Sequence, residues 1–374
     1  MLLRAGVFRR RHRDDRRIEP LAGLSRIERA ALGGVALLTA LAGTARYVSG
    51  VGTVAAFVLA GVALAGAAWV VSFATEQVGE RLGTEMTGLL QSTLGNLPEF
   101  FVVIFALNAG ERVVAQTAIL GSILVNALFV LGLVIVAGSL KADDHVMRFS
   151  PRLPNDTATL LMIASFIILL VGLADSAHDA ASHHIKTISI VGAVAILIAY
   201  GVWVRQYLST KGPAARSGGA PRLSSVTSVT LLIGAGVVSA FVSDWFVHAL
   251  EPSIRTLGIS RSFAGLVIVA TAGNAVEHAV GVVLALKGES ELAISVVKNS
   301  VAQIAAFLYP LLVLVSLLTA TTLTFALAPV YTGALLGTAV IIWQITGDGE
   351  ATPFEGAALI AAFVILATVA WFES

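Results

Sequence analysis

The feature that most constrains the fold of this chain is a series of long apolar segments that recur along almost its whole length. A helix needs roughly 20 apolar residues to cross about 30 Å of hydrocarbon, and about eleven segments reach that length. Only 13% of the residues are charged and 57% are hydrophobic, which leaves too few charges for a soluble surface. The sequence therefore predicts an all-α integral membrane protein with about 11 transmembrane helices. The predicted spans are residues 29–48, 52–73, 85–107, 114–139, 157–175, 187–206, 225–247, 262–286, 291–318, 323–345 and 354–372.

The distribution of Lys and Arg predicts the orientation in the membrane. With the N-terminus inside, the external segments hold only a few basic residues, namely Arg46, Arg112, Lys186, Arg255 and Arg261. The cytoplasmic segments hold an arginine-rich N-terminal arm together with Arg81, Lys141, Arg148, Arg152, Arg205, Lys211, Arg216, Arg222 and Lys287. Because cytoplasmic loops are enriched in Lys and Arg, we expect a cytoplasmic N-terminus in the cell (plasma or inner) membrane. The arm lacks the short apolar core and cleavage site of a signal peptide. We interpret its arginines as keeping the arm in the cytoplasm rather than as a nucleic-acid-binding element.

A Gly-, Pro- and Ser-containing stretch divides the chain in two, and such composition is typical of a flexible linker. One leading span precedes five spans before the linker, and five more follow it. Because five is odd, the second block is inverted relative to the first, which is typical of inverted-topology repeats. The predicted parts are a basic cytoplasmic arm (1–28), a leading helix (29–50), a first five-helix repeat (51–206), a cytoplasmic linker (207–224) and a second five-helix repeat (225–374).

The same polar pattern, T-x-G-N-x-x-E, occurs once in each predicted repeat, inside an apolar segment. One copy runs from Thr93 to Glu99 and the other from Thr271 to Glu277. An ionisable residue at membrane depth is a functional-site hypothesis by default, and one copy in each half predicts a shared site at the repeat interface. The alternative is a pair of structural carboxylates that are satisfied by their neighbours.

Within each copy, the Thr, Asn and Glu residues are three positions apart, so on a helix they line one side. Pro98 also frees a backbone carbonyl in the preceding turn. Hydroxyl, amide and carboxylate oxygens are the ligands that a hard cation such as Ca²⁺ prefers. Thr can instead bond its own helix, and Asn can hold two helices together. The candidate cation- and proton-binding residues are Thr93, Asn96, Glu99, Thr271, Asn274 and Glu277, with Glu99 and Glu277 as the metal-binding carboxylates.

A second polar helix follows each copy of the pattern at equal spacing. Ser122 and Ser300 come 23 residues after Glu99 and Glu277 (122 − 99 and 300 − 277). Asn126 and Gln303 then follow the two serines, one position out of register. We expect these helices to cross the pattern-bearing helices and complete an oxygen shell. Ordinary packing of the serines and interhelical bonds of the amides are the alternatives.

Two further ionisable residues adjoin the second copy of the pattern. His278 directly follows Glu277 and can either carry protons near neutral pH or pair structurally with that carboxylate. Lys298 lies within the predicted span 291–318. Its side chain can extend back to the cytoplasmic surface, or it can face the site and neutralise a carboxylate. The second arrangement would modify selectivity in favour of a monovalent or different substrate.

Other chemistries fit the sequence poorly. The chain has no cysteine, which excludes thiolate metal sites and thiol nucleophiles. No nucleotide-binding loop, G-x-S-x-G or H-E-x-x-H motif is present. The external loop with Asp175, His178, Asp179, His183 and His184 could bind a transition metal, but we interpret it as a solvated loop whose charges attract cations or buffer protons. We therefore expect neither an enzyme nor a cofactor.

At these residues the chain resembles the cation/proton exchanger family of the calcium/cation antiporter superfamily. The segment from Gly273 to His278 resembles that family's G-N-A-x-E-H, residues 95–99 resemble G-N-A-x-E, and residues 121–126 resemble G-S-I-L-S-N. The chain departs from the family in having Asn299 and Val125, a basic linker, and Lys298 before the second serine.

The resemblance implies exchange of Ca²⁺ or a related cation for protons by alternating access. Glu99 and Glu277 would be the central carboxylates, surrounded by Asn96, Asn274, Ser122, Asn126 and Gln303. The expected partners are the transported cation, protons and the lipid bilayer. A sodium-driven or monovalent cation/proton exchanger on the same fold, a channel, and a non-transporting membrane scaffold are the alternatives.

Overall fold

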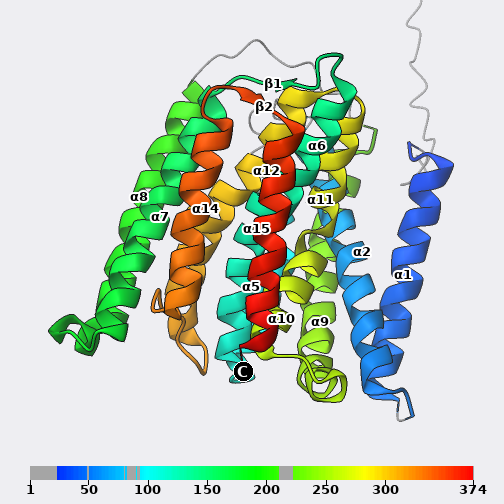
Figure 1. Ribbon diagram of the computed structural model, residues 1–374. Helices are drawn as coiled ribbons and strands as arrows, with labels where there is room; N and C mark the ends of the chain where they lie inside the picture. The colour runs from blue at the N-terminus through cyan, green and yellow to red at the C-terminus, as the bar shows by residue number, and fades with distance from the viewer. Residues whose placement is uncertain are drawn as a thin grey trace, which may run out of the picture.

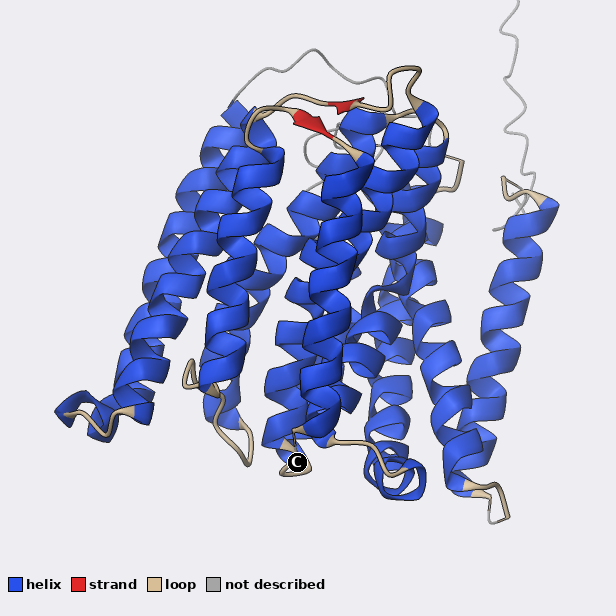
Figure 2. Cartoon of the chain, in the orientation of Figure 1, coloured by secondary structure: helices blue, strands red, loops and turns tan. Residues whose placement is uncertain are grey.

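The computed structural model describes residues 23–48, 50–79, 81, 90, 93–209 and 222–373. These residues form a bundle of helices, and the described strands are two short ones at one end (Figure 1, Figure 2). The first half contains α1 (Arg26–Tyr47), α2 (Thr53–Gly79), α4 (Leu97–Asn108), α5 (Arg112–Leu124), η1 (Val125–Val130), α6 (Leu131–Lys141), β1 (Met147–Arg148), α7 (Arg152–Ser176), η2 (Ala180–His184) and α8 (Ile185–Ser209). The second half contains α9 (Ser225–Leu257), α10 (Arg261–Phe263), η3 (Ala264–Val269), α11 (Ala270–Leu286), α12 (Ser290–Gln303), η4 (Ile304–Leu308), α13 (Tyr309–Val315), η5 (Ser316–Leu318), α14 (Pro329–Thr346), β2 (Glu350–Ala351) and α15 (Pro353–Phe372).

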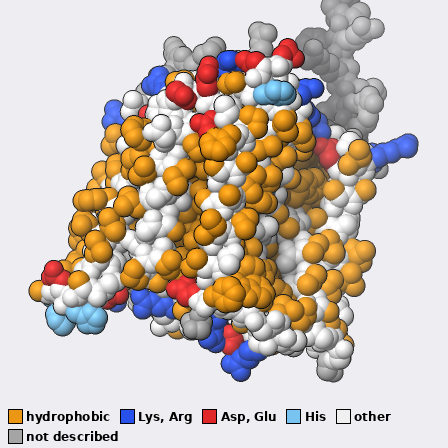
Figure 3. All heavy atoms as spheres, viewed as in Figure 1, with side chains coloured by type: hydrophobic (Ala, Val, Ile, Leu, Met, Phe, Trp, Pro, Cys, Tyr) orange, Lys and Arg blue, Asp and Glu red, His pale blue; other side chains and the backbone are white. Residues whose placement is uncertain are grey.

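The bundle has the dimensions and surface of a multi-pass membrane protein. Among the described residues, 10 continuous helical stretches are long and apolar enough to cross a membrane, and α4 is a shorter apolar helix. On the face seen in Figure 3, hydrophobic side chains cover the middle height, whereas charged side chains gather toward the two ends. This pattern confirms the predicted all-α membrane class. Residues 85–89 and 91–92 of the predicted span 85–107, most of the N-terminal arm and most of the linker lie outside the described residues.

The predicted tenth span, 323–345, begins six residues too early, because α14 starts at Pro329. Residues 319–328 are not helical, although several of their apolar side chains are buried. Irregular backbone at such depth must find partners within the protein. Here the amide of Phe325 donates to Ser189 Oγ at 3.1 Å, and Gln116 Nε2 donates to the carbonyl of Ala326 at 3.0 Å. The segment is therefore apolar because it is buried. Its backbone can be non-helical because side chains of α5 and α8 replace some helical hydrogen bonds.

The first helices of the two predicted repeats, α2 and α9, pack against each other near the centre of the molecule. Ser253 Oγ on α9 donates to the carbonyl of Thr53 on α2 at 3.1 Å. The leading helix α1 lies at the edge of the bundle and diverges from α2 toward its own N-terminal end (Figure 1). The C-terminus lies at the opposite end of the molecule from the start of α1 (Figure 1), as an odd number of spans requires.

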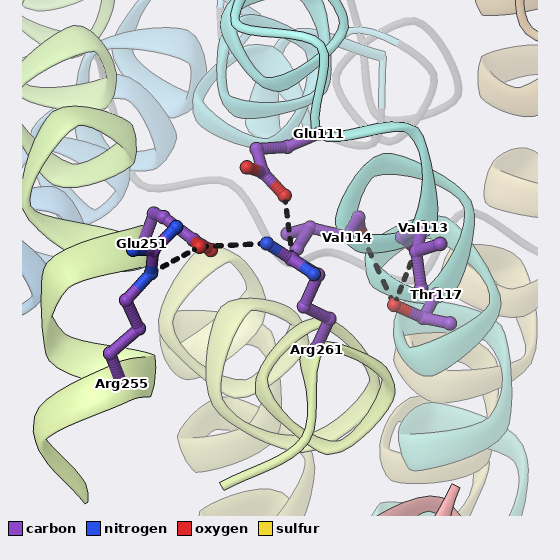
Figure 4. Close-up of polar contacts among 7 residues, drawn as sticks. All are labelled: Glu111, Val113, Val114, Thr117, Glu251, Arg255 and Arg261. Atoms are coloured by element: carbon purple, nitrogen blue, oxygen red, sulfur yellow. Dashed lines mark hydrogen bonds and ion pairs between the residues drawn. The ribbon is translucent and has the colours of Figure 1, made fainter. Parts of the chain in front are cut away.

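Polar contacts join the two halves of the chain at both ends of the bundle. At the end that carries the start of α1, β1 pairs antiparallel with β2, and Arg148 Nε lies 3.1 Å from Glu350 Oε1. At the other end, Arg261 on α10 lies between two carboxylates (Figure 4). Its Nε is 3.2 Å from Glu111 Oε2, and its Nη2 is 2.7 Å from Glu251 Oε1. Exposed pairs of this kind contribute about 0–1 kcal/mol each, so they align the halves more than they stabilise them.

Candidate functional site

The two polar patterns meet in the middle of the bundle, where α4 lies against α11. A Cβ atom built on Gly95 would lie 3.4 Å from Glu277 Oε1, and one built on Gly273 would lie 3.6 Å from Glu99 Cβ. Each glycine of one pattern therefore faces the glutamate of the other. This reciprocal arrangement explains the glycines, because a larger residue would fill the space beside the opposite carboxylate.

The start of α4 positions the first carboxylate. Asn96 is the N-cap residue of α4, and Pro98 lies in its first turn, a position at which proline is well tolerated because the amide there has no helical partner. Glu99 follows in the same turn and is 3% exposed. The positive end of the helix dipole favours a negative charge at this place. The local sequence thus places an anionic group at the broken start of a membrane helix.

Glu99 is surrounded by polar groups of other helices. Three side chains act on its carboxylate, namely Ser122 on α5 and Asn274 and Glu277 on α11. Neither oxygen of Glu99 receives a direct hydrogen bond of normal geometry within the described part of the chain. The carboxylate is therefore buried beside polar neighbours without a fixed donor, an arrangement that leaves both oxygens available to a proton or a cation.

A connected set of hydrogen bonds extends from the second carboxylate. Ser300 Oγ on α12 donates to Glu277 Oε2, and Asn126 Nδ2 on η1 donates to Ser300 Oγ at 3.3 Å. Asn274 Nδ2 donates to Ser122 Oγ at 2.9 Å. The expected crossing of the serine helices with the pattern-bearing helices is therefore present. Each serine therefore lies beside the glutamate of its own repeat, and Ser122 also accepts from the asparagine of the other.

Three of the helical stretches that form this centre contain a π-helical segment beside it. The segment η1 includes Asn126, η4 begins directly after Gln303, and η3 immediately precedes α11. Single-turn π segments inside α-helices are rare and occur frequently at functional sites. They rotate the following turns and widen the helix locally. Sequence reasoning missed them, and no residue type in these segments gives a signal that would have revealed them.

Two glycines allow α5 to approach η3 very closely. A Cβ on Gly121 would lie 2.2 Å from the carbonyl oxygen of Leu266, and a Cβ on Gly265 would lie 2.0 Å from Thr117 Oγ1. Such small-residue crossings are typical of membrane helices. The position equivalent to Gly121 in the second half is Asn299 (121 + 178, the spacing between Thr93 and Thr271), so the two halves differ in sequence at this position.

The other predicted site residues differ in burial and contacts. Thr271 is exposed, and Thr93 is half-buried. Gln303 is 2% exposed, and its side chain interacts with Tyr200 on α8. Side-chain contacts bring together Glu99, Ser122, Asn126, Asn274, Glu277 and Ser300, and Asn96 is buried at the start of α4.

The two ionisable neighbours do not adopt the contacts expected from the sequence. His278 Nε2 is buried and has no hydrogen-bond partner among the described residues, so the structural pair with Glu277 is not formed. Lys298 is 0% exposed, and its Nζ donates to Thr346 Oγ1 on α14 at 3.2 Å. Its ammonium group is therefore not exposed at the cytoplasmic surface. Its hydrogen bond is with the last residue of α14 and not with either glutamate.

The chemistry of the centre is that of a site for a hard cation. Two carboxylates, two amides and two hydroxyls supply oxygen atoms, the ligands that Ca²⁺ prefers. Among the described residues, no three His, Cys, Asp or Glu side chains gather closely enough to hold a metal ion. The oxygen groups beside the carboxylate pair are neutral amides and hydroxyls.

Comparison with known proteins shows the family and the fold of the chain. The family model described as sodium/calcium exchanger protein matches residues 52–206 and 227–372. The Ca²⁺/H⁺ antiporter ChaA of Bacillus subtilis is 30% identical over 299 residues, which are 79% of this chain and 85% of that protein. A Ca²⁺/H⁺ antiporter of Synechocystis is 28% identical and covers 87% of this chain and 92% of its own length. The solved structure of native YfkE superposes with a TM-score of 0.75 at 26% identity, covering 92% of this chain and 99% of that one. The chain belongs to the sodium/calcium exchanger protein family.

Proposed function

We propose that the protein is a secondary active antiporter that exchanges Ca²⁺ for protons across the membrane. The observation that carries the proposal is the reciprocal contact between the two patterns, in which Gly95 faces Glu277 and Gly273 faces Glu99. This contact supports a shared centre with one carboxylate from each half. The named relatives, which are Ca²⁺/H⁺ antiporters, support Ca²⁺ as the cation.

The proposed mechanism is competition between protons and the cation for Glu99 and Glu277. Two ionised carboxylates balance the charge of one Ca²⁺, whereas two unneutralised carboxylates at short range repel each other. Protonation of both groups removes the attraction and releases the ion. Either loaded form neutralises the site, so the two halves can move past each other between inward- and outward-facing states.

The neighbouring polar groups have distinct roles in this mechanism. Ser300 donates to Glu277 and so stabilises its ionised form. Asn274 and Ser122 are bonded to each other beside Glu99, which fixes the oxygens that complete the shell. Thr93, Thr271, Gln303 and His278 remain proposed contributors in states of the cycle in which the halves have moved.

The proposed orientation places the N-terminus and the linker in the cytoplasm, with residues 51–206 and 225–374 as inverted repeats. The excess of Lys and Arg in the segments on that side supports it. Because the chain has no cysteine, single cysteines at Arg222 and Arg255 provide a test. Arg222→Cys should react with an impermeant maleimide only in inverted membranes, and Arg255→Cys only in right-side-out membranes; the opposite pattern would overturn the orientation.

The function is tested by cation-dependent proton movement in proteoliposomes that carry a pH-sensitive dye. We expect an inward Ca²⁺ gradient to drive proton efflux, with little response to K⁺. A proton signal driven by Na⁺ and unaffected by Ca²⁺ would identify the sodium or monovalent exchanger instead. Ca²⁺ flux without proton movement would identify a channel, and no flux of any tested cation would favour a non-transporting scaffold.

A further inference from the structure

An apolar groove runs along the outside of the bundle between α1 and α9, with α2 as its floor. Its volume is about 700 Å³. Leu32 and Val35 of α1, Val70 of α2, and Val226, Thr230 and Gly234 of α9 are among its lining residues. The groove lies apart from the glutamate pair and has no role in the proposed exchange.

The groove has the length of one lipid leaflet. Its lining on α9 extends from Val226 to Val238, and twelve residues at 1.5 Å each span about 18 Å. Half of the hydrocarbon thickness of a bilayer is about 15 Å. An extended acyl chain of one leaflet therefore matches the groove in length.

The groove opens toward the surface that faces lipid. The outer sides of both flanking helices are apolar and exposed, including Leu37 (61%) on α1 and Ile233 (63%) on α9. Contacts between α1 and α9 are sparse compared with those between α2 and α9, so the side chains of the two helices do not fill the space between them. In hydrocarbon, such a space is occupied by lipid rather than by water, because its lining is almost entirely apolar.

Positive charge gathers at the end of the groove where α1 and α9 begin. Arg26 and Arg29 lie in the first turn of α1 and are exposed. Arg222 precedes α9 and pairs with Glu28 at 2.7 Å while its side chain remains 41% exposed. Arg81 reaches the carbonyl of Leu223 beside it. Within the described part of the chain, these four arginines outnumber the nearby acidic residues Glu28 and Glu76 at this end.

From the apolar groove and the arginines at its end, we propose that the groove binds one anionic phospholipid. Its acyl chain lies between α1 and α9, and its phosphate contacts Arg26 and Arg29. The hydroxyls of Thr227 and Thr230 line the first turns of the groove, near the level of the ester groups. Each basic residue near an anionic membrane surface contributes about 1 kcal/mol, so the two arginines give roughly 30-fold preference for an anionic over a zwitterionic headgroup. The lipid joins α1 to α9, the first helix of the second half.

The test uses the full-length protein purified in detergent, with phosphatidylglycerol and phosphatidylcholine as probes. Gly234→Leu fills the groove, because a Cβ on Gly234 meets no atom within 4 Å. Gly201→Leu on α8 is the matched control, since Gly201 is also exposed and open. Native mass spectrometry counts retained lipid, and thermal unfolding measures the increase in Tm that each lipid causes. Ala36→Phe fills the groove from α1 and replaces Gly234→Leu if that variant does not fold.

We expect wild type and Gly201→Leu to retain phosphatidylglycerol and to gain more in Tm from it than from phosphatidylcholine. Gly234→Leu and Ala36→Phe should lose both effects, and Arg26→Gln/Arg29→Gln should lose only the difference between the two lipids. Equal retention by the groove-filling variants would overturn the proposal. A dimer that the filling variants dissociate would identify a second copy as the occupant and would also overturn it. None of these readouts measures transport, so the lipid proposal and the proposed exchange can each be refuted without the other.

Discussion

The hydrogen bond from Ser300 to Glu277 gives a quantitative prediction for the pH dependence of transport. A hydrogen bond to a charged group contributes about 1.5–3 kcal/mol. In Ser300→Ala the ionised form of Glu277 loses this stabilisation, whereas the protonated form loses much less. At 1.36 kcal/mol for each pH unit, the pH midpoint of Ca²⁺ transport should move up by about one to two units. The sign follows because a higher pH is then needed to remove the proton that competes with Ca²⁺.

The assay is the initial rate of ⁴⁵Ca²⁺ uptake into proteoliposomes, measured against pH at a fixed proton gradient. Ser300→Thr keeps the hydroxyl and should retain the wild-type midpoint. Ser139→Ala is the matched control, since Ser139 is also buried and donates to the carbonyl of Ile135 in its own helix. The amide nitrogen of Asn126 loses the acceptor Ser300 Oγ but keeps its bond to the carbonyl of Ser122 at 3.0 Å. A midpoint that is unchanged, or that moves down, would refute the role of Ser300.

Three further predictions follow from contacts outside the glutamate pair. Lys298→Met should leave the apparent affinity for Ca²⁺ within about twofold of wild type, because the ammonium group contacts α14 rather than the site; a larger change in a cation-competition assay would show that its charge reaches the carboxylates. Gly265→Ala should lower the stability by about 1–3 kcal/mol through overpacking, measured by thermal unfolding, whereas Gly201→Ala on open surface should not. The Arg148 guanidinium holds the pKa of Asp144 below its usual range, so the stabilisation from this pair is present at neutral pH and is lost only as the pH falls through that lowered value. Arg148→Gln should therefore leave the pH profile of transport near neutrality unchanged, and a shift in ⁴⁵Ca²⁺ uptake there would contradict this assignment.

Hydrophobicity predicted the helices well because it reports burial in lipid, but it does not report backbone conformation. The start of the tenth span shows the difference. Leu323 and Phe325 are as buried as any helix core residue, yet their backbone is not helical. The amide of Leu323 donates to the nearby Ser316, but the groups that bond Phe325 and Ala326, Ser189 and Gln116, lie far away in sequence and in different helices. No local pattern could have revealed that these particular side chains would replace helical hydrogen bonds.

The central pair was accessible from sequence because both carboxylates lie in the same unusual context. A repeated pattern requires no knowledge of which helices touch. The partners of individual residues were less accessible, since spacing along a helix fixes the face of a side chain but not the neighbour it meets. Gln303 interacts with Tyr200, and Lys298 reaches Thr346. Both contacts depend on how α12 is rotated against α8 and α14, and the π-helical turn of η4 lies beside them.

Proton release on Ca²⁺ binding tests most directly whether Ca²⁺ and protons compete for Glu99 and Glu277. Calorimetric titration of Ca²⁺ into the purified protein, repeated in buffers of different ionisation enthalpy, measures both the affinity and the protons released. We predict that wild type releases protons as Ca²⁺ binds, and that Glu99→Gln and Glu277→Gln each remain folded but lose both signals. Proton-coupled Ca²⁺ binding that survives in either folded variant would contradict the account.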